Sequence, residues 1–207
     1  MPENLHKLFV ISSPSGGGKT SLINKLFEDS RSANFEKSIS DTSRQKREGD
    51  LEGKDYYFLS EKDFKDKIKK EEYIEYATVF GNFYGTSKEE IQTKYNNSNL
   101  ILELDWQGAY SVKELFDDAK LIFLIPPSLD DLKQRLIKRN LDSSEAIENR
   151  LSEAKKEISK SEMYDYLVLN DDFDKAFEDL SQILFEGISP IDFNSRASKD
   201  LIKRLVE

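Results

Sequence analysis

The chain has 207 residues, of which 37% are hydrophobic and 34% are charged, and its formal net charge at pH 7 is -9. This length suits one compact unit, or a core with small inserted lobes. The acidic balance argues against a surface for nucleic acid polymers, which usually carries a clear basic excess. The chain has no cysteine, which excludes disulfides and thiol chemistry.

Membrane segments and export signals are not expected either. No apolar run approaches the roughly 18–20 residues that a membrane span needs, and the start of the chain lacks the long apolar stretch of a secretory signal. We therefore expect a cytoplasmic protein without a membrane partner. His6 is the only histidine, and its place before the first expected strand favours a solvated surface role over catalysis or metal binding.

The expected core alternates buried strands with helices along the chain. Its strands are the apolar runs Lys7–Ser12, Leu100–Leu104, Lys120–Ile125 and Tyr166–Leu169. A segment of helical period follows each strand, and these segments are Lys19–Asp29, Gln107–Phe116, Ser128–Arg139 and Asp172–Phe185. Such alternation predicts an α/β fold in which helices cover both faces of a parallel sheet.

Three other segments have a different character. The stretch from Phe35 to about Gly85 contains short mixed segments and an expected hairpin at Gly81-Asn82, which predicts a small, partly antiparallel lobe inserted into the core. The stretch from Lys133 to about Lys160 reads as a charged helical hairpin that could act as a mobile cover. Ser189–Glu207 resembles a polar loop followed by a short amphipathic helix, and no role follows from its sequence.

A glycine-rich loop, Ser13-Pro-Ser-Gly-Gly-Gly-Lys-Thr20, joins the first strand to the first helix. Its glycines let successive N–H groups point at an anion, and the helix that begins near Lys19 adds the positive end of its dipole. Lys19 would reach the β- and γ-phosphates of a nucleotide, and the Thr20 hydroxyl would bind Mg²⁺. Because the full motif has glycine where Ser13 stands, a glycine-rich turn with an exposed lysine is the alternative. The predicted donor-nucleotide residues of this loop are Ser13, Pro14, Ser15, Gly16, Gly17, Gly18, Lys19, Thr20 and Ser21.

Further motifs follow in order along the chain: Ser40–Phe58 (SDTSRQKREGDLEGKDYYF), Ile74–Ala77, Gly81–Thr86, Leu104–Gly108 and Asn170–Asp172. Together with the loop, they resemble the guanylate kinase family over residues 13 to about 186. The resemblance implies a P-loop NTPase core (residues 1–34, 91–127 and 161–188), a GMP-binding lobe (35–90), a helical lid (128–160) and a C-terminal tail (189–207). It also implies Mg²⁺-dependent transfer of the ATP γ-phosphate to GMP, and to dGMP, with ATP and GMP as small-molecule partners.

The resemblance assigns the acceptor phosphate to the lobe. Arg44 and Arg47, together with Tyr56 and Tyr84, would hold the phosphate of GMP. This is chemically reasonable because planar guanidinium groups match phosphate oxygens. The alternative for the two arginines is a solvated surface position.

Base recognition falls to other residues of the lobe. Glu75 would accept hydrogen bonds from guanine N1–H and the 2-amino group, a donor pair that adenine lacks, unless it is merely an exposed strand glutamate. Ser40 and Thr86 would bring hydroxyl groups to the guanine edge. Asp41 and Ser43 stand where the family usually has serine or threonine. Asp41 has no hydroxyl group, and it either places an acid near the pocket or faces solvent.

Asp105 follows an expected strand, at the edge where parallel α/β sheets bind ligands. The resemblance implies a place near Mg²⁺ or a contact with GMP. The alternative is that its carboxylate only caps the helix that follows.

The predicted lid carries the remaining cations. Arg135 and Arg139 are four residues apart and share one helical face, and Arg150 lies on the next helix. The resemblance implies that these arginines close over the ATP phosphates and act in catalysis with Lys19 and Arg44, and that Asn170 contacts adenine. The alternative, in the absence of the family resemblance, is that these arginines are only solvated, as surface arginines on a charged helix usually are.

Two rival functions remain open at this stage. A guanylate-kinase-like interaction module would keep the fold without the activity, but the intact Lys19 and Thr20 argue against it. A kinase for another nucleoside monophosphate is disfavoured by Glu75 and by the Ser40–Phe58 motif. The sequence leaves open whether the protein is a monomer or a homodimer.

Overall fold

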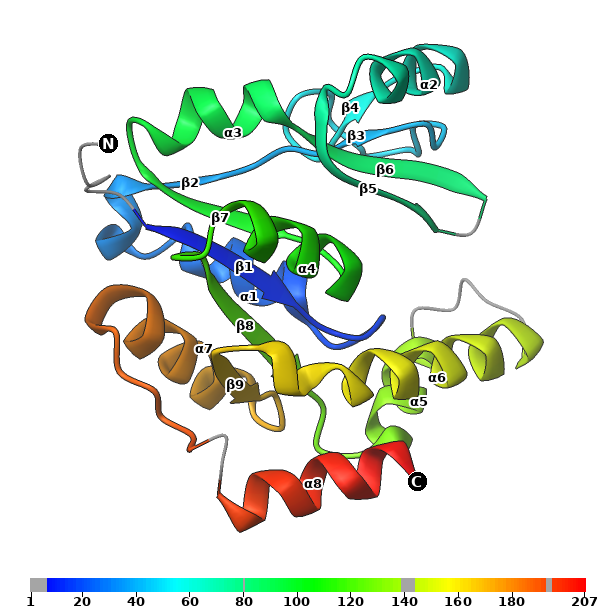
Figure 1. Cartoon of the computed structure of the whole chain (residues 1–207). Coiled ribbons are helices and arrows are strands. Elements are labelled where there is room, and N and C mark those ends of the chain that lie inside the picture. Colours follow the sequence, from blue (N-terminus) through cyan, green and yellow to red (C-terminus); the bar gives the residue numbers. More distant parts are fainter. Residues whose placement is uncertain (1–6, 80, 139–143, 193–194) are drawn as a thin grey trace. The chain divides into compact units, whose positions relative to one another are not determined.

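The computed structural model describes residues 7–79, 81–138, 144–192 and 195–207 (Figure 1). Contacts divide the chain into two compact units. The first runs to Phe9 and continues over Asn34–Ala119, and the second comprises Val10–Ala33 and Lys120–Glu207. The boundary therefore falls within the first strand, β1 (Leu8–Ser12).

The larger sheet confirms the predicted α/β class. Its strand order is β2-β7-β1-β8-β9, with β2 at Phe35–Lys37, β7 at Asn99–Glu103, β8 at Lys120–Ile125 and β9 at Tyr166–Leu169. Pairing is parallel between β2 and β7 and between β8 and β9. β1 is buried throughout and β8 is buried after its first residue, as strands covered on both faces must be.

β2 is a strand that the sequence analysis assigned to the inserted lobe. Phe35 lies opposite Asn99, so that β2 extends the larger sheet beside β7. The strand has three residues and one apolar side chain, which is too short for its periodicity to be recognised.

Helices of the second unit follow the predicted pattern with shorter bounds. They are α1 (Lys19–Leu26), α5 (Leu129–Lys138), α6 (Ser144–Ser159), α7 (Phe173–Ser181) and α8 (Arg196–Val206), with a 3-10 turn at Ser161–Met163 and a π turn at Gln182–Glu186. Within this unit α1 packs against α7, α5 against α6, and α6 against α8. The predicted helix Lys19–Asp29 ends early because Asp29 accepts a hydrogen bond from the Arg31 N–H (2.9 Å) and starts a separate 3-10 turn, Ser30–Asn34.

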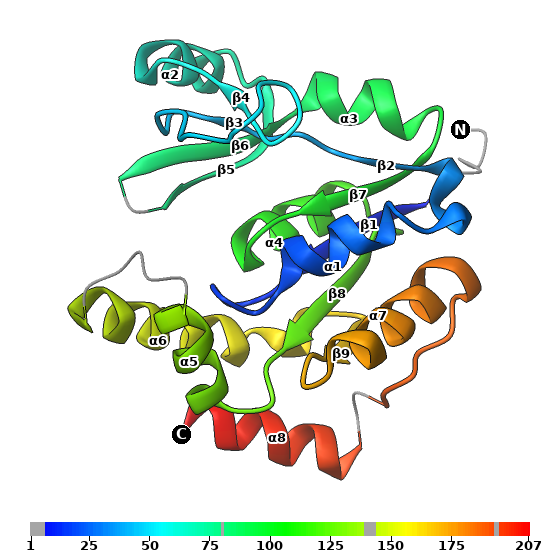
Figure 2. The ribbon, with the colours of Figure 1, turned by 180° about the vertical axis from the view of Figure 1, so that it is seen from behind.

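The first unit contains the smaller sheet, with strand order β4-β3-β6-β5. Its strands are β3 (Asp41–Thr42), β4 (Tyr57–Phe58), β5 (Tyr73–Val79) and β6 (Asn82–Ser87), and its helices are α2 (Glu61–Lys69), α3 (Lys88–Tyr95) and α4 (Trp106–Leu115). The predicted hairpin is confirmed, because β5 and β6 pair antiparallel on either side of Gly81, whose φ is +78°. Figure 2 shows the hairpin from the opposite side.

α2 lies close against the smaller sheet. Phe64 is fully buried, and its ring stacks on Tyr73 (4.5 Å between centroids) and Phe83 (5.4 Å). Gly85 on β6 makes this approach possible. A Cβ at Gly85 would lie 3.0 Å from Tyr73 Cδ1 and 3.1 Å from Phe64 Cζ, so a larger residue there would push α2 away.

No helix within the described part of the chain is long and apolar enough to cross a membrane.

The C-terminal helix offers a test of packing. Leu205 on α8 is 2% exposed, so Leu205→Ala should lower the free energy of unfolding by about 2–4 kcal/mol through lost burial and the cavity left behind. Urea denaturation followed by circular dichroism measures the change. Lys203→Ala, on the same helix but exposed, should shift it by less than about 0.5 kcal/mol. Equal effects of the two substitutions would show that α8 does not depend on this packing.

Candidate functional site

The loop between β1 and α1 folds back on itself. The Gly17 N–H donates to the Pro14 carbonyl oxygen (2.8 Å), and a Cβ at Gly17 would lie 2.8 Å from the Cβ of Ser13. Ser13 is itself buried, and its hydroxyl donates to the Pro14 carbonyl (3.2 Å). The loop therefore accommodates serine where the motif has glycine, because its close neighbour Gly17 has no side chain.

α1 begins at Lys19, as predicted. Its N-cap is Gly18, which has φ +91° and provides no side-chain cap. The first N–H groups of a helix lack intrahelical partners, so the start of α1 provides donors suited to an anion. Lys19 is half-buried here, which differs from the alternative of a glycine-rich turn with an exposed lysine.

Asn170, which directly follows β9, contacts two glycines of this loop. Its side-chain amide donates to the Gly17 carbonyl (2.6 Å), and a Cβ at Gly18 would lie only 2.4 Å from that amide nitrogen. The Asn170 backbone carbonyl also accepts a hydrogen bond from Arg135 Nη2 (2.7 Å). The sequence analysis assigned Asn170 only to adenine and missed this supporting role, which no local pattern reveals.

Two of the predicted lid arginines lie near the glycine-rich loop before α1, which belongs to the same unit. Arg135 extends from α5 to the residue that supports the loop, and Arg150 on α6 donates from Nη1 to the Ser15 hydroxyl (3.2 Å). Both are partly buried and hydrogen-bonded, so the alternative of merely solvated side chains does not hold for them, and their predicted contact with the ATP phosphates stays a prediction. Arg139 and His6 lie outside the described residues.

In the first unit, Glu75 and Thr86 form a buried pair. They lie opposite each other on β5 and β6, and the Thr86 hydroxyl donates to Glu75 Oε1 (2.6 Å). Glu75 is 9% exposed and Thr86 is fully buried. The alternative of an exposed strand glutamate is therefore wrong.

α4 provides the other neighbour of Glu75. A Cβ at Gly108 would lie 3.1 Å from Glu75 Oε2, so this glycine leaves room for the carboxylate. Asp105 caps the same helix, accepting a hydrogen bond from the Gly108 N–H (2.9 Å). The capping alternative for Asp105 is confirmed, and its predicted roles near Mg²⁺ or GMP stay predictions.

Burial, opposed by the hydrogen bond from Thr86 and aided by the nearby charge of Asp105, raises the pKa of Glu75 to about 7. A carboxyl group with this pKa changes its protonation near neutral pH. Its ability to accept hydrogen bonds from a ligand therefore depends on pH in the same range.

Arg44 lies in an aromatic cluster of the same unit. Its guanidinium group pairs with Asp50 (Nη2 to Oδ2, 2.8 Å) and lies over the rings of Tyr56 and Phe58, 5.5 Å from each centroid. Tyr56 in turn contacts Tyr84 (5.7 Å between centroids). Burial raises the pKa of Tyr56 to about 12, so its hydroxyl keeps its proton and can donate.

The structure thus brings Arg44, Tyr56 and Tyr84 together, as predicted for a phosphate site. Arg47 follows in the same loop, where its backbone N–H donates to Asp50 Oδ2 (2.8 Å) and its side chain is exposed. Ser40 lies between β2 and β3, with its carbonyl bound to the Tyr57 N–H (3.0 Å).

Asp41 and Ser43 occupy positions that the sequence analysis did not foresee. Asp41 is 3% exposed and pairs with Lys67, so it does not face solvent. Ser43 accepts a hydrogen bond from the Phe83 N–H (2.8 Å) and so serves the sheet.

Comparison with known proteins decides the family. The sequence profile described as guanylate kinase matches residues 5–187. The chain belongs to the guanylate kinase family. This assignment confirms the predicted resemblance, the P-loop NTPase fold and the enzyme class, a nucleoside monophosphate kinase.

Individual members of the guanylate kinase family match over most of their length. The guanylate kinase of Wolbachia sp. subsp. Brugia malayi (strain TRS) is 46% identical over 184 residues, which are 88% of this chain and 93% of that protein. The guanylate kinase of Hahella chejuensis (strain KCTC 2396) is 48% identical over 178 residues, 86% of this chain and 85% of its own. The crystal structure of guanylate kinase from Anaplasma phagocytophilum has a TM-score of 0.71 at 32% identity, covering 99% of this chain and 98% of that one.

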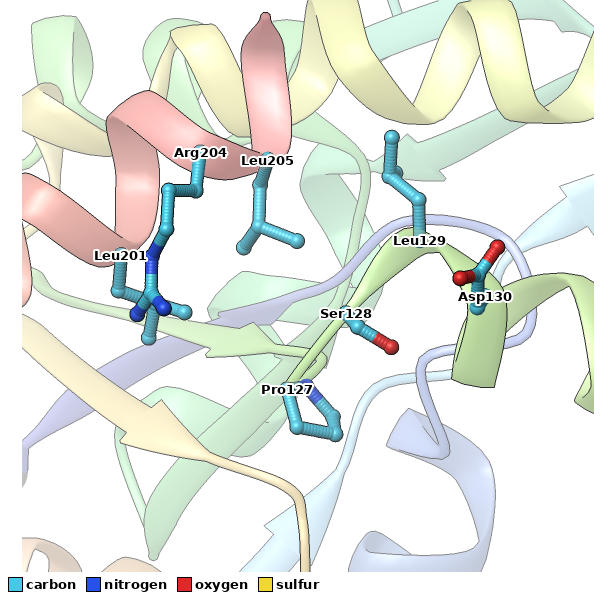
Figure 3. Close-up of a pocket in the computed structure, with 7 residues that line it drawn as sticks. All are labelled: Pro127, Ser128, Leu129, Asp130, Leu201, Arg204 and Leu205. Atoms are coloured by element: carbon cyan, nitrogen blue, oxygen red, sulfur yellow. The ribbon is translucent and has the colours of Figure 1, made fainter.

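α8 lies beyond the residues that the guanylate kinase profile matches. A cavity of about 270 Å³ separates this helix from the start of α5, and Figure 3 shows Arg204 and Leu205 on one side and Ser128 and Leu129 on the other. Its lining contains no residue of the predicted nucleotide sites. The cavity is therefore distinct from the predicted ATP and GMP sites.

The Mg²⁺ that guanylate kinases use would be coordinated mainly by the nucleotide. No group of three or more His, Asp or Glu side chains in the described ranges is placed to hold a metal ion. Mg²⁺ is commonly bound by one or two protein oxygens together with substrate phosphates and water. The hydroxyl of Thr20 at the start of α1 fits that donor set, so Thr20 stays a predicted ligand, as does Asp105.

The contact between Gly18 and Asn170 predicts a donor-site variant. Gly18→Ala should raise the Kd for ATP at least about tenfold, since the methyl group meets the Asn170 amide and the left-handed backbone is costly for alanine. Isothermal titration measures the affinity. Gly187→Ala is the matched control, because Gly187 also has a positive φ (+72°) but has open space around its Cβ position. Unchanged ATP affinity in Gly18→Ala would refute the close contact.

Proposed function

We propose that this chain transfers the γ-phosphate of ATP to GMP in the presence of Mg²⁺, giving ADP and GDP. The observation that supports this most is the buried Glu75–Thr86 pair, because a carboxylate there suits the N1–H and 2-amino donors of guanine. We further propose that dGMP is accepted, since the contacts assigned to the base and phosphate do not require the ribose 2′-hydroxyl.

The donor nucleotide would be held by the loop before α1. Backbone N–H groups of the loop and of the first helical turn would surround the β-phosphate, and Lys19 would neutralise the β- and γ-phosphates. Asn170 keeps the loop in shape through Gly17. Bound Mg²⁺ would neutralise charge on the β- and γ-phosphate oxygens.

The acceptor nucleotide would be held at both ends. Glu75, Thr86 and Ser40 would bind the guanine edge, while Arg44 and Arg47, with the hydroxyls of Tyr56 and Tyr84, would bind its phosphate. The ion pair between Arg44 and Asp50 and the stacking on Tyr56 hold the guanidinium group in place before GMP arrives. A pre-positioned cation loses less conformational freedom on binding.

Catalysis would come from positioning and charge. Phosphoryl transfer develops negative charge on the moving group, so that Lys19, Arg135 and Arg150 would stabilise it, together with Arg139 of the predicted lid. No general base is needed, because the phosphate dianion of GMP is already a nucleophile. Closing the lid would exclude water and limit hydrolysis of ATP.

The reaction is tested by a panel of acceptors. With ATP and Mg²⁺, ADP release should be fast with GMP, present with dGMP, and weak with AMP, UMP and dTMP. Lys19→Ala should lower kcat at least about 100-fold by removing a cation from the transferring group. Lys25→Ala changes an exposed lysine of the same helix and should keep wild-type activity. No acceptor-dependent ADP release would favour a non-catalytic interaction module.

The raised pKa of Glu75 predicts how GMP binding depends on pH. The carboxyl becomes protonated as the pH falls through about 7 and then no longer accepts both guanine donors. The KM for GMP should therefore rise by up to about tenfold from pH 8 to pH 6. Steady-state kinetics at constant ionic strength measure it.

Glu75→Gln serves as the control for this profile. It removes the titrating carboxyl but leaves the ionisation of the GMP phosphate unchanged, so that any remaining slope belongs to the substrate. Identical pH profiles for the wild type and Glu75→Gln would show that Glu75 does not titrate in this range.

A further inference from the structure

Asp41 is a buried carboxylate with two partners from different elements. It is 3% exposed, and its Oδ2 receives hydrogen bonds from Lys67 Nζ (2.5 Å) on α2 and from the Tyr73 hydroxyl (2.8 Å) on β5. The Lys67 ammonium also lies 5.2 Å from the centroid of the Tyr73 ring. A buried charge persists only where such partners offset its loss of hydration. We call Lys67, Asp41 and Tyr73 the anchor cluster.

The anchor cluster lies on the face of the smaller sheet that α2 covers. Asp41 on β3 is opposite Gly85 on β6, and residues opposite each other in an antiparallel pair share a face. Gly85 lies beneath Phe64 and Tyr73. Because side chains alternate along a strand, the next residue, Thr86, faces the other side with Glu75.

A β-bulge separates the two faces along β5. Tyr73 pairs with Ser87 and Glu75 pairs with Thr86, so that the register shifts between Tyr73 and Glu75. In a regular strand, residues two apart point to the same face. The extra residue of the bulge places Tyr73 with α2 and Glu75 with Thr86, although only Ile74 lies between them.

We propose that the anchor cluster holds this bulge in place and thereby directs the Glu75 carboxylate toward the guanine base. Asp41 and Tyr73 would thus be positioning residues for base selection. The inference deepens the proposed function and rests on it.

The alternative register shows why an anchor is needed. A one-residue slip in pairing turns every following side chain to the opposite face, and here it would turn Glu75 toward α2. The Tyr73 hydroxyl resists that slip because it is bound to a carboxylate on another strand. Burial, followed by the hydrogen bond to Asp41, raises the pKa of Tyr73, so the hydroxyl stays a donor.

The test compares GMP with inosine monophosphate, which lacks the 2-amino group. Tyr73→Phe removes the anchoring hydroxyl and little else, and Asp41→Asn removes the charge. Each should lower the ratio of kcat/KM for GMP over inosine monophosphate by about fivefold to tenfold, the effect of losing one well-placed hydrogen bond. The KM for ATP should stay unchanged.

Matched lysines on α2 separate positioning from general stability. Lys67→Met should lower the same ratio, whereas Lys62→Met should not, because Lys62 forms an exposed pair with Asp66 on the same helix. Thermal unfolding of every variant shows which are folded at the assay temperature. The double variant Asp41→Asn/Tyr73→Phe should be no worse than the poorer single variant, since both remove one interaction.

The outcomes separate the two proposals. Folded Tyr73→Phe with a wild-type selectivity ratio would overturn the positioning role while leaving the guanylate kinase activity intact. An equal loss of kcat/KM for both acceptors would also overturn it, because a general defect is not one of base selection. A wild-type protein that does not phosphorylate GMP would overturn the proposed function, and the positioning role with it.

Discussion

A polar or charged group that leaves water must find a partner inside the protein, and this constraint shapes the candidate residues in each of the two units. Glu75 is buried beside the Thr86 hydroxyl, and Asp41 is buried between Lys67 and Tyr73. In the other unit the Asn170 amide meets the Gly17 carbonyl. Each partner offsets the hydration that the buried group has lost. The same hydrogen bond holds the backbone segment around that group in one conformation.

The two units meet this constraint in different ways. The loop before α1, in the second unit, depends on backbone geometry, since glycines let the loop approach Asn170 and leave the start of α1 without a side-chain cap. The candidate residues of the first unit depend on side chains, since a carboxylate, a guanidinium group and two tyrosines must keep defined orientations. An enzyme that distinguishes one base from another needs this second kind of order, because selectivity arises from groups left unpaired by the wrong ligand.

The sequence predicted those features that have a local period or a local motif. The apolar runs located β1, β8 and β9 to within a residue, and Gly81-Asn82 located the hairpin. β2 was missed because three residues hold too little pattern. The role of Asn170 was missed because its partner Gly17 lies 153 positions away, and no spacing rule connects such residues.

Within the site, the residue types could be predicted but not their surroundings. Family motifs pointed to Glu75, Thr86 and Arg44, yet the bulge that turns Glu75 appears only in the pairing of β5 with β6. Asp41 departs from the usual pattern, and its burial depends on Lys67 and Tyr73 together. A property shared by three separate segments cannot be found by examining any one of them.

Gly85 has a consequence for how this sequence can change over generations. Its missing side chain makes room for the rings of Phe64 and Tyr73, so the three positions form one steric unit. A lineage that acquired alanine at position 85 would need a smaller side chain at one of the other two, and would also have to shift the Glu75 carbonyl oxygen, which lies 3.0 Å from that Cβ position. Substitutions at these sites should therefore arise in compensating sets among descendants, and the order in which they appear is constrained.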